Sequence, residues 1–380
     1  MAFDAAVIGG GLVGSAIAYH LVSAGVRTLL VDRADIGRAT DAGAGILSPE
    51  TNSRDPEAWF RLAVEAVDYY PALVERLAAD QGGDTGYAQC GKLVVAVSED
   101  EIEPFARARD IIFERRRARG LPSAGDLHEV TAAEARELFP PLARVHGAIY
   151  SRVSARVDGR LLNAALRAAA EARGLVVRAG SVEQLVRDGD AVTGLVVGGE
   201  RVPAGAVAIA GGAWSEPFGR QLGVAIDVAP QRGQIIHLGL PGTDTSRWPM
   251  VSAFHHHYMV AWPDGRVVAG ATRETGSGFA PHTTAAGVRE VLGEALRVAP
   301  GLAHADVREI RVGLRPLTAD TLPVLGAVPG ITGVFLATGH GPTGLTLGAY
   351  SGKVVAAQML GQPPGTDLRP FSVARFRAAG

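Results

Sequence analysis

The sequence contains a single cysteine, Cys90, and only two lysines, Lys92 and Lys353, among its 380 residues. One cysteine excludes an internal disulfide and any zinc or iron–sulfur site that is built from several cysteines. Because lysine is so scarce, arginine carries nearly all of the positive charge of the chain.

Long apolar runs are also lacking. No run approaches the ~18–20 residues that a helix needs to cross a bilayer, and the longest, residues 204–214, contains three glycines. Residues 1–4 provide no basic leader before the first apolar segment, so we expect no signal peptide. These features predict a soluble, cytoplasmic protein, with association to a membrane surface and self-association left open.

Neither positive nor negative charge is in large excess, since the chain has 37 basic and 39 acidic residues. This balance argues against a nucleic-acid binder that works by neutralising phosphates. Hydrophobic residues make up 47% of the chain and charged residues 20%, which excludes global disorder and provides for a large core. The length indicates about two domains.

The first thirty residues have the pattern of one βαβ unit. Residues 5–8 form a short apolar segment, residues 9–11 are glycines, and residues 15–24 have helical periodicity. Gly25 ends this helix, and residues 27–31 predict a second strand. A parallel pair with a right-handed crossover is the common way to close such a unit.

The turn of this unit carries the pattern Gly9-x-Gly11-x-x-Gly14. The first glycine permits a tight turn, the second lets the backbone approach a pyrophosphate, and the third allows close packing of helix on strand. The N-terminus of the helix that follows presents free N–H groups to the phosphates. The pattern therefore predicts a dinucleotide site.

Asp32 lies 18 positions after Gly14, at the end of the second strand, where a carboxylate can accept from ribose hydroxyls. Arg33 follows it, but the carboxylate beside it would repel a 2′-phosphate. We therefore expect FAD or NAD rather than NADP, and the motif alone does not separate the first two.

Further along the chain, helical and strand-like segments alternate. Helices are predicted at residues 56–79, 99–119, 161–172, 285–298 and 350–360, and strands at 92–97, 175–177, 206–210, 234–238, 257–262, 266–271 and 333–337. This alternation predicts a mixed α/β fold with two interleaved domains.

Five collinear segments carry a resemblance to a known family. They are residues 9–19 (GGGLVGSAIAY), 37–47 (GRATDAGAGIL), 210–215 (AGGAWS), 313–316 (GLRP) and 339–345 (GHGPTGL). With them, nearly the whole chain resembles the FAD-dependent D-amino-acid oxidase superfamily, nearest to glycine oxidase and bacterial D-amino-acid dehydrogenase. The resemblance implies FAD as the cofactor and a Rossmann-like FAD-binding domain interleaved with a mixed-sheet substrate domain, the glutathione-reductase-like arrangement.

The resemblance also implies the domain bounds and the cofactor-binding residues. Residues 1–50, 150–224 and 313–380 would form the FAD-binding domain, and residues 51–149 and 225–312 the substrate-binding domain. Cofactor-binding residues would be Gly9, Gly11, Leu12, Val13, Gly14, Asp32, Arg33, Ala39, Thr40, Ala44, Gly45, Ile46, Val182, Gly211, Trp214, Gly339, His340, Gly341, Pro342, Thr343, Gly344, Leu345 and Thr346.

At the substrate end, the resemblance implies that Arg315 holds the substrate carboxylate and that Tyr258 lies beside it. An arginine suits this role because its planar fork matches a carboxylate. If residues 256–258 are in a strand, His256 shares a face with Tyr258 and becomes a third candidate. Adjacent strand residues do not converge on one ion, so we expect no metal at His255–His257.

Two departures from the family pattern bear on the substrate. Some glycine oxidases have an additional arginine in the flavin-edge turn, where this chain has Pro342 and Thr343, so carboxylate binding would depend more on Arg315. Ala261 and Trp262 stand where relatives often have Pro-Arg, which favours a different pocket. Since the C-terminal part has no cysteine, we expect FAD to be bound non-covalently.

The resemblance implies oxidative deamination of a D-amino acid or a glycine-like amine to a 2-oxo acid and ammonia, with O₂ or a quinone or other electron carrier as the acceptor. The alternatives are a secondary amine such as proline or an N-methyl amino acid, a 2-hydroxy acid, and a flavin-bearing subunit of an electron-transfer complex. Oxidase and dehydrogenase are not separated by any of these motifs.

Overall fold

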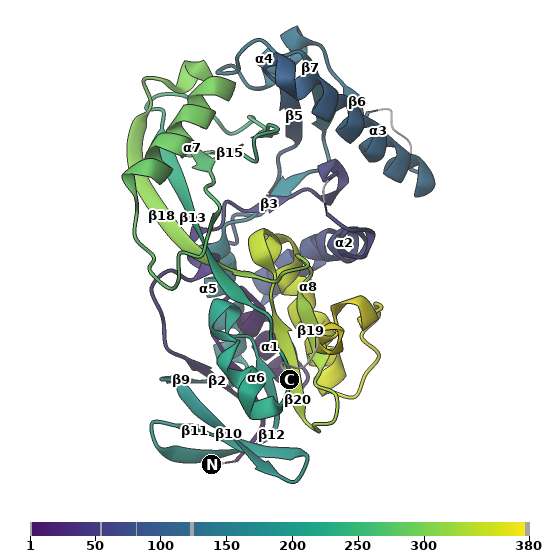
Figure 1. Cartoon of the computed structure of the whole chain (residues 1–380), viewed down its shortest axis with the longest axis vertical. Helices are drawn as coiled ribbons and strands as arrows, with labels where there is room; N and C mark the ends of the chain where they lie inside the picture. The colour runs from purple at the N-terminus through teal and green to yellow at the C-terminus, as the bar shows by residue number, and fades with distance from the viewer. Residues whose placement is uncertain (1, 54, 81, 122–124, 377–380) are drawn as a thin grey trace.

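The computed structural model describes residues 2–53, 55–80, 82–121 and 125–376, and its strands form two large sheets and one small one (Figure 1). The small sheet joins three two-residue strands, β3 (Ile46–Leu47), β8 (Ala155–Arg156) and β4 (Ala88–Gln89).

The first large sheet has a parallel centre, in the order β9 (Val176–Ala179), β2 (Thr28–Asp32), β1 (Phe3–Ile8), β12 (Glu200–Ile209) and β20 (Val334–Thr338). The antiparallel strands β10 (Val182–Asp188), β11 (Ala191–Val197) and β19 (Val324–Ala327) extend it. Helices α1 (Leu12–Ser23), α5 (Gly159–Ala172), α8 (Gly344–Met359), α2 (Glu57–Ala79) and α6 (Pro217–Leu222) pack around it.

Both faces of the centre of this sheet are buried, as alternate residues of β1 show. Ala5 and Val7 belong to the core formed with α1, α5 and α8, while Ala6 and Ile8 belong to the core formed with α6 and β11. Successive side chains of a strand point to opposite faces, so a strand that is covered on both sides is apolar throughout. This accounts for the uninterrupted apolar segment at residues 5–8.

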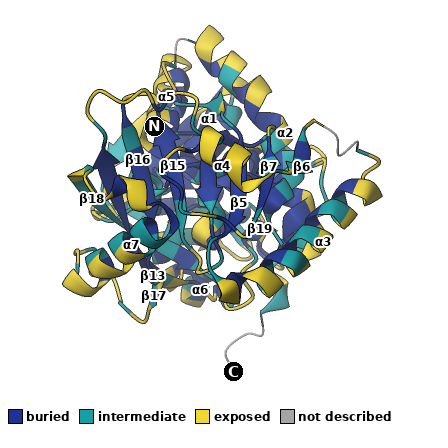
Figure 2. Cartoon of the chain, turned by 90° about the horizontal axis from the view of Figure 1, so that it is seen from above, coloured by how far each residue is buried: buried dark blue, intermediate teal, exposed yellow. Residues whose placement is uncertain are grey.

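The second large sheet has the order β17 (Glu274–Thr275), β13 (Ala229–Gly239), β16 (Arg266–Gly270), β15 (Tyr258–Trp262), β14 (Met250–Ser252), β5 (Lys92–Ala96), β7 (Gly147–Ser151) and β6 (Leu127–Glu129), with β18 (Asp306–Leu317) also paired to β13. Helices α3 (Ile102–Ala118), α4 (Ala132–Leu138) and α7 (Ala285–Val298) cover it, with their outer sides exposed (Figure 2). Among the described residues, no helix combines the length and apolar character needed to cross a membrane.

The predicted fold class, a mixed α/β protein with a Rossmann-like unit, is confirmed. The predicted division into two interleaved domains stays a prediction. Two of its boundaries, near residues 150 and 313, fall inside strands β7 and β18, so the chain passes between the two groups of segments without a break in secondary structure.

The last helix begins earlier than predicted, at Gly344 instead of Tyr350. Its glycines reflect close packing on α1, since a Cβ at Gly352 would lie 2.5 Å from the Cβ of Ala16. Sequence periodicity treats glycine as a helix breaker, whereas here tertiary packing favours it.

The strand prediction at His256 is wrong. Strand β15 begins at Tyr258, and His256 lies in the exposed turn that follows β14, with a φ of +63°. A residue in this left-handed conformation does not continue the alternation of a strand. The expectation that His256 shares a strand face with Tyr258 therefore has no structural basis.

Candidate active site

A cavity of about 370 Å³ lies where the first sheet meets the second. The carboxyl ends of β1, β2, β12 and β20 border it on one side, and residues of β13, β15 and β18 on the other. Its volume is in the range of small-molecule and cofactor sites, and the carboxyl edge of a parallel sheet is where such ligands bind in open α/β folds.

The glycine turn after β1 forms the floor of this cavity. Gly9 has a φ of +103°, and a Cβ there would lie 2.5 Å from the carbonyl oxygen of Ala210. A Cβ at Gly14 would lie 1.9 Å from the carbonyl oxygen of Gly9, which is the close helix–strand approach predicted for the third glycine. Gly11 precedes α1 as its N-cap, and the next two residues, Leu12 and Val13, line the cavity.

Asp32 ends β2 and lines the cavity, as expected of a ribose ligand. Its Oδ2 accepts a hydrogen bond from Nη1 of Arg38 at 2.9 Å, and Nε of Arg38 donates to Asp41 at 3.1 Å. Arg33 is instead paired with Asp35 at 2.8 Å, and its guanidinium lies 6.0 Å from the ring of Trp214. Arg38, more than Arg33, fixes the carboxylate of Asp32.

The turn before α8 brings a buried histidine to the same cavity. His340 is only 3% exposed, and burial lowers its pKa to about 4, so its imidazole is neutral near pH 7. Its Nε2 has no hydrogen-bond partner among the described residues. A buried unpaired nitrogen is costly, and the residue that carries it lines the cavity.

Arg315 lies on β18 at the other end of the cavity. Its Nη1 donates to the carbonyl oxygen of Thr272 at 2.9 Å and to Oε1 of Gln231 at 3.4 Å. The guanidinium lies across Gly233 of the neighbouring strand, where a Cβ would be 2.4 Å from Cζ of Arg315. Burial lowers the pKa of Arg315 while the phenol of Tyr258 opposes this shift, and an arginine stays protonated in proteins.

Tyr258 begins β15 and lines the same end. Burial raises its pKa, and the guanidinium groups of Arg315 and Arg273 act against this shift. The phenol is thus protonated at neutral pH and can donate a hydrogen bond. Gly270 leaves room for it, because a Cβ there would lie 2.8 Å from the Tyr258 hydroxyl.

The cavity collects most of the predicted residues. It is lined by Arg315 and Tyr258 and by Gly9, Gly11, Leu12, Val13, Asp32, Arg33, Ala39, Thr40, Ala44, Val182, Gly211, Trp214, His340, Gly341, Pro342, Gly344 and Leu345. The lining does not include His256, Gly14, Gly45, Ile46, Gly339, Thr343 or Thr346. Their contact with a cofactor, like that of the lining residues, stays a prediction.

Three of the residues outside the lining have other structural tasks. Gly45 makes room for the backbone at Val157, whose carbonyl oxygen would lie 1.8 Å from a Cβ. The Thr346 hydroxyl donates to the carbonyl oxygen of Ile46 at 2.9 Å, and the Thr343 hydroxyl accepts from the indole of Trp59 at 3.1 Å. These contacts hold the loop and the last helix around the cavity.

Sequence reasoning missed four charged residues of the cavity lining, Asp35, Arg38, Glu183 and Arg273, of which the two arginines bear most on the site. Arg38 lies inside the small-residue loop, and its spacing from Asp32 gave no sign of the ion pair that joins them. Arg273 follows β16 by three residues and lines the cavity near Arg315. It belongs to none of the segments that carry the family resemblance.

The parallel sheet, the glycine turn and the cavity at the carboxyl edge of the strands are the features of a dinucleotide-binding protein, and the half-buried Arg315 lies at the other end of the same cavity. Residues 4–358 match the model of the family described as FAD dependent oxidoreductase (DAO), and the chain belongs to this family. The prediction that the chain is an FAD-dependent oxidoreductase is thereby confirmed at the level of the family.

Relatives and solved structures agree with this assignment. The uncharacterized oxidoreductase YurR of Bacillus subtilis (strain 168) is 37% identical over 369 residues, covering 97% of this chain and 98% of that protein. The glycine oxidase of Geobacillus kaustophilus (strain HTA426) is 30% identical, covering 98% of this chain and 97% of that protein. The crystal structure of iminodiacetate oxidase from Chelativorans sp. BNC1 is 38% identical, with a TM-score of 0.91, and covers 97% of this chain and 98% of that one.

The residues present fit FAD. The turn at Gly9 and Gly11 leaves the backbone open for a pyrophosphate, Asp32 can accept from a ribose, and His340, whose Nε2 has no partner among the described residues, lines the same cavity. Cys90, the only cysteine of the chain, precedes β5 and is not part of the cavity lining. This placement supports the prediction that FAD is bound without a covalent link.

Proposed function

We propose that the protein oxidises the Cα–N bond of a glycine-like amine or a D-amino acid and releases a 2-oxo acid and ammonia. The observation that carries this proposal is the half-buried guanidinium of Arg315, which lines one cavity with the glycine turn and Asp32 and donates its hydrogen bonds to neutral groups. Among the described residues no carboxylate forms an ion pair with Arg315, and a cation without such a partner favours an anionic ligand.

The protein's own task in this reaction is to bind and orient. Arg315 would hold the substrate carboxylate through charge-assisted hydrogen bonds, and the Tyr258 hydroxyl would add another donor beside it. With the carboxylate fixed, Cα of the substrate would face the centre of the cavity. FAD, when bound, would supply the two-electron oxidant, accepting the hydride from Cα at its N5.

The balance of the reaction needs little acid–base chemistry from the chain. The amine enters neutral and loses one proton as the hydride leaves Cα, so the organic product is an imine. Water then hydrolyses the imine to the 2-oxo acid and ammonia. O₂ or another electron carrier takes up the two electrons.

A secondary amine is the second candidate, and one comparison favours it. The solved structure of iminodiacetate oxidase is more similar in sequence, at 38% identity, than that of a glycine oxidase, at 29%. Pro342 and Thr343 replace the additional arginine found in some glycine oxidases, so this chain departs from them at the flavin edge. The same oxidation of a secondary amine would release a 2-oxo acid and a primary amine.

Product analysis tests the proposal. The FAD-loaded protein is incubated with glycine, D-alanine, sarcosine and iminodiacetate in the presence of an artificial electron acceptor. We expect a 2-oxo acid from at least one of them, with ammonia from a primary amine, or methylamine or glycine from a secondary one. Glycolate and lactate are tested in parallel. Oxidation of these hydroxy acids alone would overturn the proposal, as would the absence of a 2-oxo acid from all four amines.

A further inference from the structure

A second arginine lies at the substrate end of the cavity. Arg273 is in the extended segment between β16 and β17 and lines the cavity together with Arg315 and Tyr258. Unlike Arg315 it is exposed, which places it at the rim of the cavity. Its guanidinium is near enough to lower the pKa of Tyr258, whose burial acts in the opposite direction.

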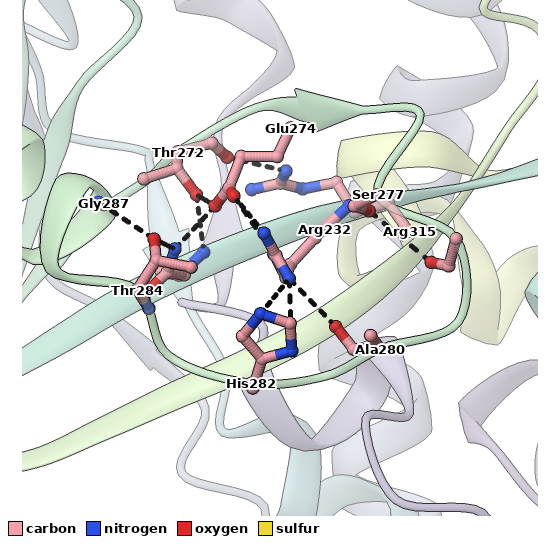
Figure 3. Close-up of polar contacts among 11 residues, drawn as sticks. Arg232, Thr272, Glu274, Ser277, Ala280, His282, Thr284, Gly287 and Arg315 are labelled. Atoms are coloured by element: carbon pink, nitrogen blue, oxygen red, sulfur yellow. Dashed lines mark hydrogen bonds and ion pairs between the residues drawn. The ribbon is translucent and has the colours of Figure 1, made fainter.

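The residues on either side of Arg273 are fixed by a buried polar network (Figure 3). Oε2 of Glu274 accepts from Nη2 of Arg232 at 2.6 Å, and Oε1 accepts from Nε2 of Gln234 at 2.6 Å and from the Thr272 hydroxyl at 2.8 Å. The carbonyl oxygen of Thr272 accepts from Arg315. The backbone that carries Arg273 is thus tied to the arginine that binds the proposed carboxylate.

The same network leaves Arg273 without a carboxylate. Both oxygens of Glu274, the acid next to it in sequence, are engaged by other donors. Among the described residues, no carboxylate oxygen lies within 4.0 Å of the Arg273 guanidinium, so Arg273 forms no ion pair there. Arg232, by contrast, is paired with Glu274 and also donates to the carbonyl oxygen of Ala280 at 3.1 Å.

The carboxylates of the cavity lining are confined to one end, where Arg33 and Arg38 pair with two of them. The acidic lining residues are Asp32, Asp35 and Glu183, which follow or belong to the strands of the nucleotide-binding sheet. At the substrate end the charged lining residues are Arg273 and Arg315, so that end is doubly positive among the residues described. A ligand with one carboxylate would pair with Arg315 and leave the guanidinium of Arg273 unmatched.

We propose that Arg273 binds a second carboxylate, so that the preferred substrate is an amine that bears two carboxylates, one held by Arg315 and the other at the rim of the cavity. This inference rests on the proposed function and narrows its substrate class. Arg273 would determine specificity, while Arg315 would position the carbon that is oxidised.

Kinetics with paired substrates test the role of Arg273. Arg273→Gln removes the charge and keeps a polar side chain of moderate length at an exposed position, so the fold should be unaffected. For iminodiacetate we expect the variant to raise KM by about tenfold or more with little change in kcat. For sarcosine, a secondary amine with one carboxylate, KM should change by less than about threefold. Arg289→Gln, on the exposed surface of α7, is the matched control.

A binding measurement separates substrate recognition from turnover. Diglycolate, the ether analogue of iminodiacetate, has both carboxylates but no amine to oxidise, and methoxyacetate has one. Perturbation of the flavin absorption band should give a lower Kd for diglycolate than for methoxyacetate. Arg273→Gln should remove most of this difference, and Arg273→Lys should restore part of it.

The outcomes distinguish the two proposals. If sarcosine is oxidised and the variant affects iminodiacetate and sarcosine equally, the assignment of Arg273 is overturned while the amine oxidation stands. Equal affinity of the unaltered protein for diglycolate and methoxyacetate would overturn it as well. If no amine yields a 2-oxo acid, the proposed function itself fails.

Discussion

Arg315 is oriented before any ligand binds, because its Nη1 donates both to the carbonyl oxygen of Thr272 and to the amide oxygen of Gln231. Both partners are neutral, so they fix the guanidinium without cancelling its charge. Gly233 opposite provides the space that the flat group needs. A lysine could supply the charge here, but not the two parallel donors of the fork.

Substitution of Arg315 should therefore act mainly on substrate binding. Arg315→Ala should raise KM for the best amine substrate by roughly two orders of magnitude, since removing a partner of a buried charge pair costs ~2–5 kcal/mol. Arg315→Lys should recover only part of this loss. Steady-state kinetics measure both effects, and the flavin content of the purified variants serves as the control. Unchanged KM and kcat in Arg315→Ala would show that this arginine does not hold the substrate.

Asp32 offers a test at the nucleotide end. Asp32→Asn removes the charge that Arg38 pairs with and weakens the acceptor offered to the ribose. We expect the Kd for FAD to rise by about tenfold, in line with about 1.4 kcal/mol for a lost charge-assisted hydrogen bond. Fluorescence titration of the apoprotein with FAD measures it. An unaltered Kd would mean that Asp32 does not contact the cofactor.

Among the helices, α1 and α8 pack closely together because α8 has a glycine at the point of contact. A Cβ at Gly352 would lie 2.5 Å from the Cβ of Ala16 and 2.9 Å from the backbone nitrogen of Ile17. The helix of Gly293 offers the opposite case, because nothing lies within 4 Å of a Cβ there. Gly352 is thus required by close packing, whereas Gly293 is not, and the two helical glycines can be distinguished only from their packing.

These two positions give a matched prediction for stability. Gly352→Ala should lower the free energy of unfolding by about 1–3 kcal/mol through overpacking. Gly293→Ala should raise it by up to about 1 kcal/mol, because alanine favours a helix more than glycine does. Urea denaturation of both variants measures the changes. Equal effects at the two sites would contradict the packing described for α1 and α8.

The elements also show which parts of the fold can be predicted from sequence. The βαβ unit and Asp32 could be predicted because the motif is local, with its turn, helix and strand within about thirty residues. The early start of α8 could not be predicted, because Gly344 and Gly348 look like helix-breaking residues in the sequence. Only the surface of α1 shows why glycines are tolerated there. The expectation for His256 was wrong for a related reason, since the turn conformation of this residue depends on where β14 and β15 pair.

For the molecule as a whole, two buried histidines link stability to pH. His237 and His340 are 2% and 3% exposed, and burial lowers the pKa of each to about 4, against about 6.5 in an unfolded chain. Between these pH values the unfolded state binds more protons than the folded state. The free energy of unfolding therefore falls as the pH is lowered from 6.5 to 4, by up to about 3 kcal/mol for each histidine.

His237→Gln tests this linkage away from the cavity, because the glutamine amide can still accept from Arg266, which donates to His237 at 3.2 Å. Urea denaturation at several pH values between 4 and 7 should give a shallower dependence in the variant, with little difference above pH 6.5. The same slope in both proteins would show that His237 does not remain neutral in the folded state.

The substrate end shows the limit of sequence reasoning at this scale. Arg315 could be predicted from its short motif, but its partners Gln231, Gly233 and Thr272 come from distant segments that meet only when β13 and β18 pair. Arg273 belongs to no motif, and its place in the cavity depends on the network around Glu274. Such a site is defined by sheet register, which local patterns do not report.

The central claim is that the cavity orients an amine for oxidation by holding its carboxylate. Anaerobic mixing of the FAD-loaded protein with matched pairs, glycine against methylamine and sarcosine against dimethylamine, tests it most directly through bleaching of the flavin band. We expect rapid reduction by the carboxylate-bearing member of at least one pair and none by its partner. Equal reduction by both members of a pair, or a flavin that stays oxidised with every carboxylate-bearing amine including iminodiacetate, would contradict it.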